Sequence, residues 1–343
     1  MYVRRNIRIN YMLKESWVVL AFAAVWSFIV VYVHEVLGYT WIVMPVLPVT
    51  LIGIAVSLYL GFKSVSAYSR WWEARTALGD IIAKSREWAI QVQSLIFTDT
   101  QTVPKETQQL LIYRHLAWFN AVCYVLRRSS RLRTSERTRL FQHRRIGHNI
   151  PTMHQDPTSF GRFLTPAEYA AAQTYRNPPA YLIRRQAETV RELARTGYLD
   201  SVRQYEMIAL LARLDFDHGI CERIKHTPFP RQIAYFGTVF TWLFIVLLPL
   251  AFLDVFESEA GTEHLSTILT HEFMFSLVPF AMLISWIFFM IEKVGDSSED
   301  PFEGGVNDVP ISALFRVTEI DLLQDLGETN IPSLLEPVDD VLY

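Results

Sequence analysis

Residues 36–62 form a run of 27 residues without a charged side chain. A helix needs roughly 20 apolar residues to cross a hydrocarbon core about 30 Å thick. The run ends at Lys63, and a basic, aromatic segment follows that contains Arg70, Trp71 and Trp72. Because Trp, Lys and Arg gather where hydrocarbon meets water, this junction predicts an integral membrane protein.

Three further charge-free runs meet the same length criterion, at residues 16–33, 232–253 and 273–291. The first is too long for the apolar region of a signal peptide, and no A-x-A-like cleavage site follows it, so we interpret it as a span. The sequence therefore predicts four spans. Hydrophobic residues make up 51% of the 343, which leaves room for a polar part as well.

The basic residues are segregated along the chain. Of the 32 Lys and Arg, 4 precede the first span, 26 lie within residues 63–231 and 2 follow the fourth span. The connections at residues 34–40 and 254–272 contain none. Since Lys and Arg stay on the cytoplasmic side, both termini and the middle segment are expected there. Cys123 and Cys221 then lie in a reducing compartment, and we expect no structural disulfide.

The polar part has helical periodicity and no strand-like alternation. A proline-free pattern continues from the second span through residues 64–97, which predicts a helix that leaves the membrane without a break. A proline after Thr165 favours a capped helix start, and Pro178-Pro179 a break. Further helices are expected at residues 104–128, 166–196, 200–213 and 311–326, with a basic connector at 127–162 and an acidic tail without periodicity at 336–343. The domain boundaries that follow are 1–62, 63–231 with a basic loop near 129–162, 232–291, and 292–343.

Several sequence blocks resemble signatures of the bestrophin family, particularly of its bacterial members, and their order covers nearly the whole chain. The blocks are Gly53-Ile-Ala-Val-Ser-Leu-Tyr-Leu-Gly-Phe-Lys63 with Ala67-Tyr-Ser-Arg-Trp-Trp-Glu-Ala-Arg75, Cys221-Glu-Arg-Ile224 with Thr227-Pro-Phe-Pro230, and Glu299-Asp-Pro-Phe302 with Asn307-Asp-Val-Pro310. Residues 131–162 look like an insertion peculiar to this protein.

The resemblance implies an all-α membrane protein with four transmembrane helices per subunit and a large helical cytosolic region. It further implies a homopentameric ion channel of the bacterial inner membrane, whose second helices line one axial pore. By correspondence with the family, Ile54, Leu58 and Phe62 form the narrow neck and Val202 the cytosolic aperture. The implied partners are further copies of the chain, membrane lipid and permeant monovalent ions, with no cofactor and no nucleic acid.

Helical spacing gives the neck independent support. Ile54, Leu58 and Phe62 are four residues apart and so form one stripe along a helix. Gly53, Ser57 and Gly61 form an adjacent stripe of small residues, which suits close helix packing in lipid. An ordinary packed span is the alternative interpretation. Rings of apolar side chains gate by dewetting, so permeation would depend on the width of the ring.

A hydrophobic neck does not itself select the sign of the permeant ion, and the deciding field can come from the outer entrance or from the vestibule. The acids at the outer mouth are Glu35, Asp254, Glu257, Glu259 and Glu263, alongside His34 and without Lys or Arg. Such a field raises the local concentration of cations and favours a cation channel. A solvated acidic loop without a role in selectivity, and a chloride channel of the same architecture, are the alternatives.

Calcium binding is not expected. Eukaryotic bestrophins bind calcium through an acidic cluster after the Glu-Asp-Pro-Phe motif, but this chain has Glu-Gly-Gly-Val-Asn at residues 303–307. The remaining candidates for a weak metal site are Asp296, Glu299 and Asp300.

Other functions receive less support from the sequence. A secondary transporter would show inverted repeats and broken mid-membrane helices, which the sequence lacks. A membrane scaffold would use its cytosolic helices for partners. The basic run from Arg127 to Arg145 could attract anionic lipid headgroups or form a solvated loop. No motif of a hydrolase or nucleotide-binding enzyme is present, so we expect no catalysis.

Overall fold

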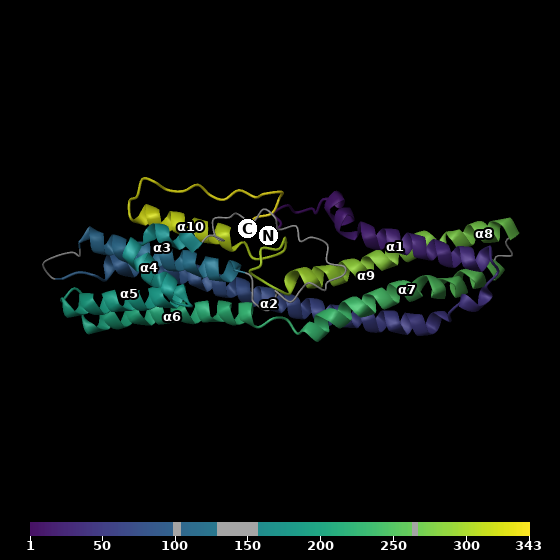
Figure 1. The fold of residues 1–343 in the computed structure, drawn as a ribbon, viewed down its shortest axis with the longest axis horizontal. Helices are drawn as coiled ribbons and strands as arrows, with labels where there is room; N and C mark the ends of the chain where they lie inside the picture. Colours follow the sequence, from purple (N-terminus) through teal and green to yellow (C-terminus); the bar gives the residue numbers. More distant parts are fainter. Residues whose placement is uncertain (99–103, 129–156, 263–266) are drawn as a thin grey trace. The chain divides into compact units, whose positions relative to one another are not determined.

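The computed structural model describes residues 1–98, 104–128, 157–262 and 267–343, and it is built from helices (Figure 1). The expected basic loop at 129–162 therefore lies mostly outside the described residues, as does Glu263. The elements are α1 (Ile9–Glu35), η1 (Thr40–Ile42), α2 (Val46–Ser94), α3 (Lys105–Arg127), η4 (Pro157–Phe163), α4 (Pro166–Thr174), α5 (Pro178–Arg195), α6 (Ser201–His226), α7 (Arg231–Thr262), α8 (Thr267–Phe275), α9 (Leu277–Ser298) and α10 (Ile311–Asp325).

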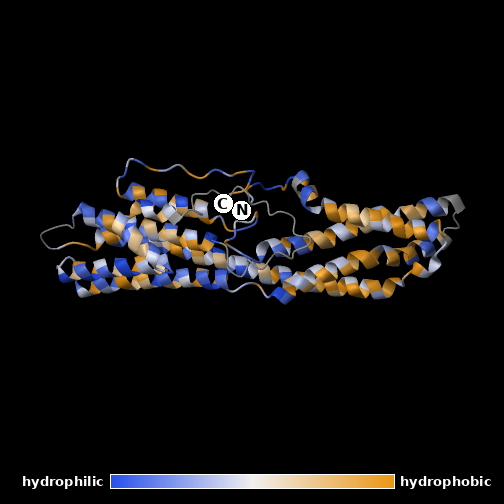
Figure 2. Ribbon diagram, viewed as in Figure 1, coloured by the Kyte–Doolittle hydropathy of each residue, from blue (hydrophilic) through white to orange (hydrophobic). Residues whose placement is uncertain are grey.

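Among the described residues, four helical segments are long and apolar enough to cross a membrane, which agrees with the predicted number of spans. They are Met12–Glu35, Thr40–Ser94, Arg231–Ala260 and Thr270–Ser298. Figure 2 shows apolar residues concentrated along α1, α7, α9 and the N-terminal part of α2. As predicted, α2 runs from the second span into the polar part without a break.

The described chain divides into two compact units. The apolar unit comprises Arg4–Ser69 and Phe229–Glu299, and the polar unit comprises Met1–Val3, Arg70–Pro228 and Asp300–Tyr343. Each unit has its own buried hydrophobic core.

Hydrogen bonds from two tryptophan indoles connect helices of the apolar unit. Trp26 of α1 donates its Nε1–H to the carbonyl oxygen of Val246 in α7, at 2.9 Å. Trp286 of α9 donates to the Ser16 hydroxyl in α1, at 3.0 Å. A buried indole N–H without an acceptor is costly, so these bonds let the bulky rings enter the core.

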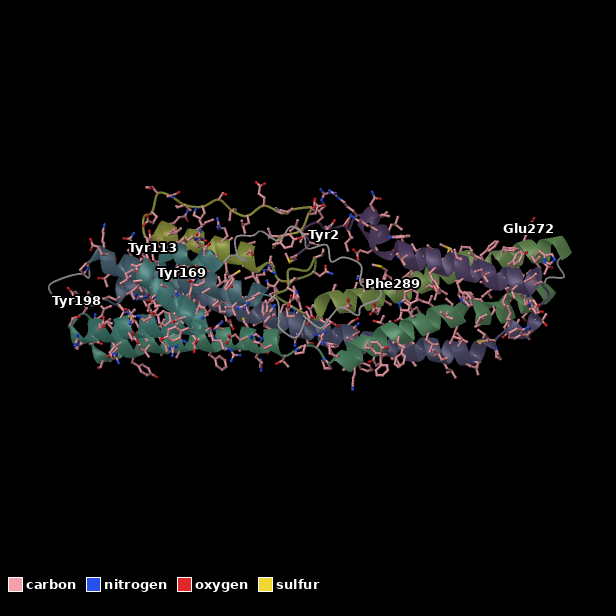
Figure 3. The ribbon with its side chains drawn as sticks, viewed as in Figure 1. Tyr2, Tyr113, Tyr169, Tyr198, Glu272 and Phe289 are labelled. Carbon is pink, nitrogen blue, oxygen red and sulfur yellow. The ribbon has the colours of Figure 1, made fainter. Side chains whose placement is uncertain are left out.

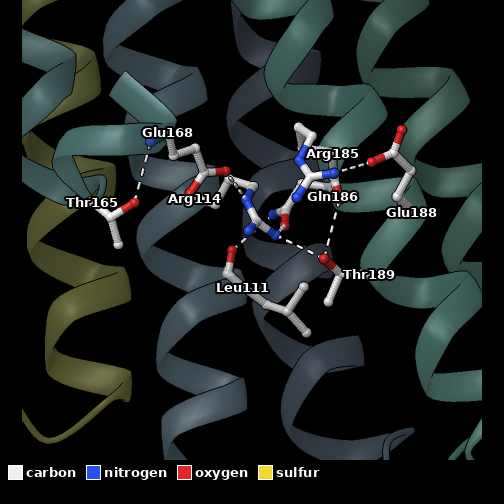
Figure 4. Close-up of polar contacts among 8 residues, drawn as sticks. All are labelled: Leu111, Arg114, Thr165, Glu168, Arg185, Gln186, Glu188 and Thr189. Carbon is white, nitrogen blue, oxygen red and sulfur yellow. Dashed lines mark hydrogen bonds and ion pairs between the residues drawn. The ribbon is translucent and has the colours of Figure 1, made fainter. Parts of the chain in front are cut away.

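An arginine network holds three helices of the polar unit together (Figure 4). The buried Arg114 guanidinium of α3 donates to the Glu168 carboxylate of α4 at 2.5 Å and to the Thr189 hydroxyl of α5 at 2.9 Å. Gln186 completes the network by donating to the carbonyl oxygen of Leu111, at 2.8 Å. Buried charges need such partners, because an unpaired charge out of water destabilises the fold.

The helix starts of the polar unit follow the predicted signals. Thr165 Oγ1 accepts the backbone N–H of Glu168 at 3.3 Å, and Pro166 occupies the first turn of α4. Helix α4 ends before Pro178, and α5 begins there with the Asn177 side chain as its cap. Gly197, with φ +85°, follows the end of α5, where a glycine commonly terminates a helix.

Helix α6 corrects one sequence expectation. The sequence pattern predicts an end at Arg213, but the helix continues to His226. The buried side chains of Leu214, Cys221 and Ile224 extend its core-facing stripe, so packing outweighs the low helix propensity of Gly219. Only residues 227–230 are left as the extended approach to α7.

The fourth span is interrupted near its start. It is divided at Ser276 into α8 and α9, three residues before Pro279. A proline has no N–H to donate and disturbs the turn before it, so the helix is interrupted there.

The C-terminal tail pairs with the start of the chain rather than standing apart. Tyr2 and Val341 form an antiparallel bridge, and the Val3 N–H donates to the carbonyl oxygen of Asp340 at 3.0 Å. Figure 3 labels Tyr2 at this junction, beside the C-terminal segment. Backbone pairing of this kind has no side-chain periodicity, which is why the sequence pattern did not predict it.

Candidate functional site

One face of α2 in the apolar unit is uncovered. Ile54, Leu58 and Phe62 are 53%, 61% and 73% exposed, although they are large apolar side chains inside a charge-free run. On the opposite face Val56 and Leu60 are buried in the core. The predicted neck residues therefore share one stripe that the rest of the described chain leaves free.

The stripe of small residues has two different environments. A Cβ atom at Gly53 would lie 2.8 Å from the Phe244 ring of α7, so glycine is needed for this close approach. Ser57 and Gly61 instead lie on the exposed side, and no described atom outside the neighbouring turns of α2 lies within 4 Å of a Cβ placed at Gly61. Of the two glycines, Gly53 alone serves packing within the subunit.

A buried ion pair lies directly beside the exposed stripe. The Lys63 Nζ lies 3.2 Å from Glu292 Oε1 of α9, and these side chains are 1% and 8% exposed. The Thr238 hydroxyl of α7 donates to the same carboxylate oxygen at 2.7 Å. The sequence pattern places Lys63 at the start of a basic, aromatic segment and does not reveal its partner. The signal that could have found the pair is that Lys63 and Glu292 each end a charge-free run on the same predicted side of the membrane.

Two acids of the predicted outer mouth, Glu35 and Asp254, have structural contacts within the chain. Glu35 is largely buried and contacts His34 Nδ1 at 2.8 Å and His271 Nδ1 at 2.5 Å. Asp254 Oδ2 accepts the backbone N–H of Val46 at 3.1 Å, at the start of α2. Glu257 is exposed and lies 3.7 Å from His34 Nε2. Two of these acids thus have structural partners that the sequence did not reveal.

Val202 lies in the first turn of α6, in the polar unit, and is 66% exposed. Asp200 caps this turn by accepting the N–H groups of Val202 and Arg203, both at 2.9 Å. These hydrogen bonds and the Arg203 guanidinium lower the pKa of the Asp200 carboxyl. Arg203 also donates to the carbonyl oxygen of Leu95 at 2.8 Å. The aperture candidate is therefore held on a rigid, capped helix start.

The candidates for a metal site do not converge. Among the described residues, no group of three or more His, Cys, Asp or Glu side chains could hold a metal ion, so Asp296, Glu299 and Asp300 do not form a shared site. Asp308, in the turn after them, is engaged: Oδ1 accepts the N–H of Phe302 at 2.8 Å, and Oδ2 lies 3.3 Å from the Arg127 guanidinium. This carboxylate has the role of a turn cap.

Known proteins resemble this chain over most of its length. A voltage-dependent anion channel-forming protein of Mesorhizobium japonicum is 28% identical over 288 residues, which cover 83% of this chain and 77% of that relative. A protein of the same name from Escherichia coli K12 is 25% identical over 293 residues, with coverage of 84% and 80%.

Solved structures show the same fold. The crystal structure of a bacterial bestrophin homologue from Klebsiella pneumoniae has a TM-score of 0.72 to this chain at 21% identity and covers 90% of this chain and 98% of its own. The family model of bacterial and fungal bestrophin proteins matches residues 10–324. This multi-pass membrane chain therefore belongs to the bacterial and fungal bestrophin family.

Proposed function

We propose that this chain forms a homopentameric channel for small monovalent ions in a bacterial inner membrane, with α2 lining the axis and Ile54, Leu58 and Phe62 as its neck. The observation that carries the proposal is the uncovered apolar stripe on α2, in a chain of the bestrophin family. Related proteins carry the name anion channel-forming, which supports ion conduction.

Self-association is expected because a single chain cannot enclose a pore. Four spans cannot enclose a pore, so the path must lie between copies. Ser57 and Gly61 on the exposed side of α2 would let a neighbouring helix approach closely. Large apolar residues then face the axis while small residues face the next copy, which is the arrangement that a ring of identical helices requires.

The neck would work by controlling hydration. Water leaves a narrow apolar cylinder, and an ion that enters it must shed part of its own water. Rings of Ile54, Leu58 and Phe62 would therefore oppose conduction while narrow and allow it when wider. Val202 would form a second apolar ring at the cytosolic end.

Cations are the first candidate ion. The exposed Glu257 and the absence of Lys and Arg from residues 34–40 and 254–272 give the outer mouth a negative field. The second candidate is an anion. It is favoured by the names of the curated relatives, which call them anion channel-forming.

Planar-bilayer recording of the purified protein under asymmetric salt tests the proposal. A channel gives unitary current steps, and the reversal potential gives the sign of the favoured ion. Slow coupled flux without unitary steps would indicate a transporter, and the absence of both would indicate a scaffold. Native mass spectrometry of the same sample should give five subunits, and a monomer would contradict the proposed axis.

A further inference from the structure

We infer that the ion pair between Lys63 and Glu292 fixes the rotation of α2 about its own axis, and so keeps Leu58 and Phe62 turned toward the pore. This inference rests on the proposed channel function. It assigns a positioning role to two charged residues that do not themselves line the axis.

The Lys63–Glu292 ion pair is linked to the neck because Lys63 is the next residue after Phe62 on α2. Phe62 and Lys63 are consecutive residues of one helix, so their side chains leave the axis about 100° apart. Phe62 is the most exposed of the neck residues, while the Lys63 side chain is almost completely buried. A rotation of α2 that turned Phe62 from the axis would also pull Lys63 from Glu292.

The lysine stem runs through a narrow slot. A Cβ atom at Gly237 of α7 would lie 3.3 Å from Lys63 Cδ, and one at Gly295 of α9 would lie 3.8 Å from Lys63 Cδ and Cε. The Tyr59 hydroxyl, one turn earlier on α2, donates to the carbonyl oxygen of Ile233 at 3.1 Å. Lys63 is thus held by α7 along its stem and by α9 at its ammonium group.

The cost of a buried charge explains why the pair favours one rotation of α2 about its axis. Each charge lies at the first position after a charge-free run and is buried, and a buried charge without a partner is strongly destabilising. Each has the other as its charged partner, with the Thr238 hydroxyl as the further hydrogen-bond donor to Glu292. Replacement of both charges by apolar groups would avoid the free-energy cost of burying charges. It would also remove the contact that fixes the rotation of α2.

The experiment follows the accessibility of position 62 in proteoliposomes of the full chain. Phe62→Cys introduces a thiol whose reaction with a charged, water-soluble methanethiosulfonate is measured by mass spectrometry. The two native cysteines, Cys123 and Cys221, are buried. Addition of Lys63→Met or Glu292→Gln should lower the reaction rate about tenfold, which corresponds to 1.4 kcal/mol. The swapped pair Lys63→Glu/Glu292→Lys should restore the rate.

Two variants guard against simple misfolding. Lys63→Met/Glu292→Met leaves no lone charge and should fold while labelling slowly. Thr238→Val keeps both charges and should lower the rate by less.

Lys293→Met is the matched control. It removes the neighbouring lysine of α9, whose ammonium lies 3.8 Å from Glu15 of α1, and should leave the rate at position 62 unchanged.

The readout separates this inference from the channel proposal. Unchanged labelling in the doubly apolar variant and in Thr238→Val would overturn the positioning role, as would a swapped pair that labels as slowly as the single variants. Absence of unitary current from the wild-type protein would instead remove the channel function, while the labelling rates would still report the rotation of α2.

Discussion

At the residue scale, Leu58 and Phe62 are large apolar side chains that the described subunit leaves exposed. Neither is needed for the core of its own subunit, because the opposite side of α2 supplies the core contacts. Their truncation to alanine is therefore expected to leave the fold of the subunit intact, so a change in current would report on the neck itself.

We predict that Leu58→Ala and Phe62→Ala raise the single-channel conductance, because each widens an apolar ring and lowers the cost of wetting it. Val25→Ala is the control, since Val25 is an exposed apolar residue of α1. Unitary currents in planar bilayers measure the effect. Unchanged conductance in both α2 variants would show that these side chains do not line the pore.

His115 illustrates a buried titratable group. Burial lowers the pKa of His115 to about 3, well below its ordinary value of 6.5. The unfolded chain therefore binds the proton more readily than the folded chain, so the stabilisation is present above pH 6.5 and is lost as the pH falls from there toward 3.

We predict that His115→Phe makes the stability of the polar unit less dependent on pH. The expected change in slope is at most about 1.4 kcal/mol per pH unit for one site. Denaturant unfolding at several pH values between about 4 and 7, a range about the ordinary histidine pKa, measures it. An unaltered slope would show that other groups carry the acid sensitivity.

The helix α2 is the central element because it contributes both to the apolar core and to the exposed stripe. Its contact with α7 depends on Gly53, where the Phe244 ring occupies the space that a side chain would need. Farther along the same helix, a Cβ placed at Gly79 would have no described atom within 4 Å outside the neighbouring turns of α2. A side chain at Gly53 would therefore clash with α7, whereas a side chain at Gly79 has room within the described subunit.

We predict that Gly53→Val destabilises the protein by about 1 to 3 kcal/mol, the usual cost of overpacking. Gly79→Ala should stabilise it by about 0.5 to 1 kcal/mol, because alanine is the better helix former. Thermal unfolding in detergent compares the two variants. A Gly53→Val protein as stable as the wild type would contradict the close contact with Phe244.

The helices α3, α4 and α5 depend on Arg114 in the same unit (Figure 4). We predict that Arg114→Met costs about 3 to 5 kcal/mol, because it leaves the buried Glu168 unpaired. Arg185→Met breaks the exposed pair with Glu188 and should cost no more than about 1 kcal/mol. Equal losses of stability for the two variants in a thermal melt would mean that the buried Arg114–Glu168 pair contributes no more than the exposed Arg185–Glu188 pair.

The described residues combine apolar helices with a polar helical unit, and the basic residues of the chain lie outside the apolar runs. We predict that both termini are cytoplasmic, because Lys and Arg precede the first span and are abundant in residues 63–231, and such residues stay preferentially on the cytoplasmic side. A C-terminal green fluorescent protein fusion should fluoresce, and an alkaline phosphatase fusion at the same place should be inactive. The reverse pattern would invert the proposed orientation of the pore.

Local signals in the sequence were enough to predict the four spans, the unbroken α2, the proline-directed starts of α4 and α5, and the spacing of Ile54, Leu58 and Phe62. Hydrophobic runs, caps and prolines act within a few residues, so the chain alone reveals them. The length of α6 was underestimated because tertiary packing carried the helix through Gly219. The break at Ser276 lies three residues before Pro279 inside an otherwise apolar run, so hydropathy alone does not locate it.

Contacts between distant residues became visible only once the helices were packed. Glu292 is separated from Lys63 by 229 positions, and Glu35 meets His271 only because α1 and α8 lie together. Such pairs depend on how whole helices pack, and no local periodicity encodes their partners. The physical reason is that burial stabilises an apolar residue wherever it packs, whereas a buried charge needs one particular partner at one particular place.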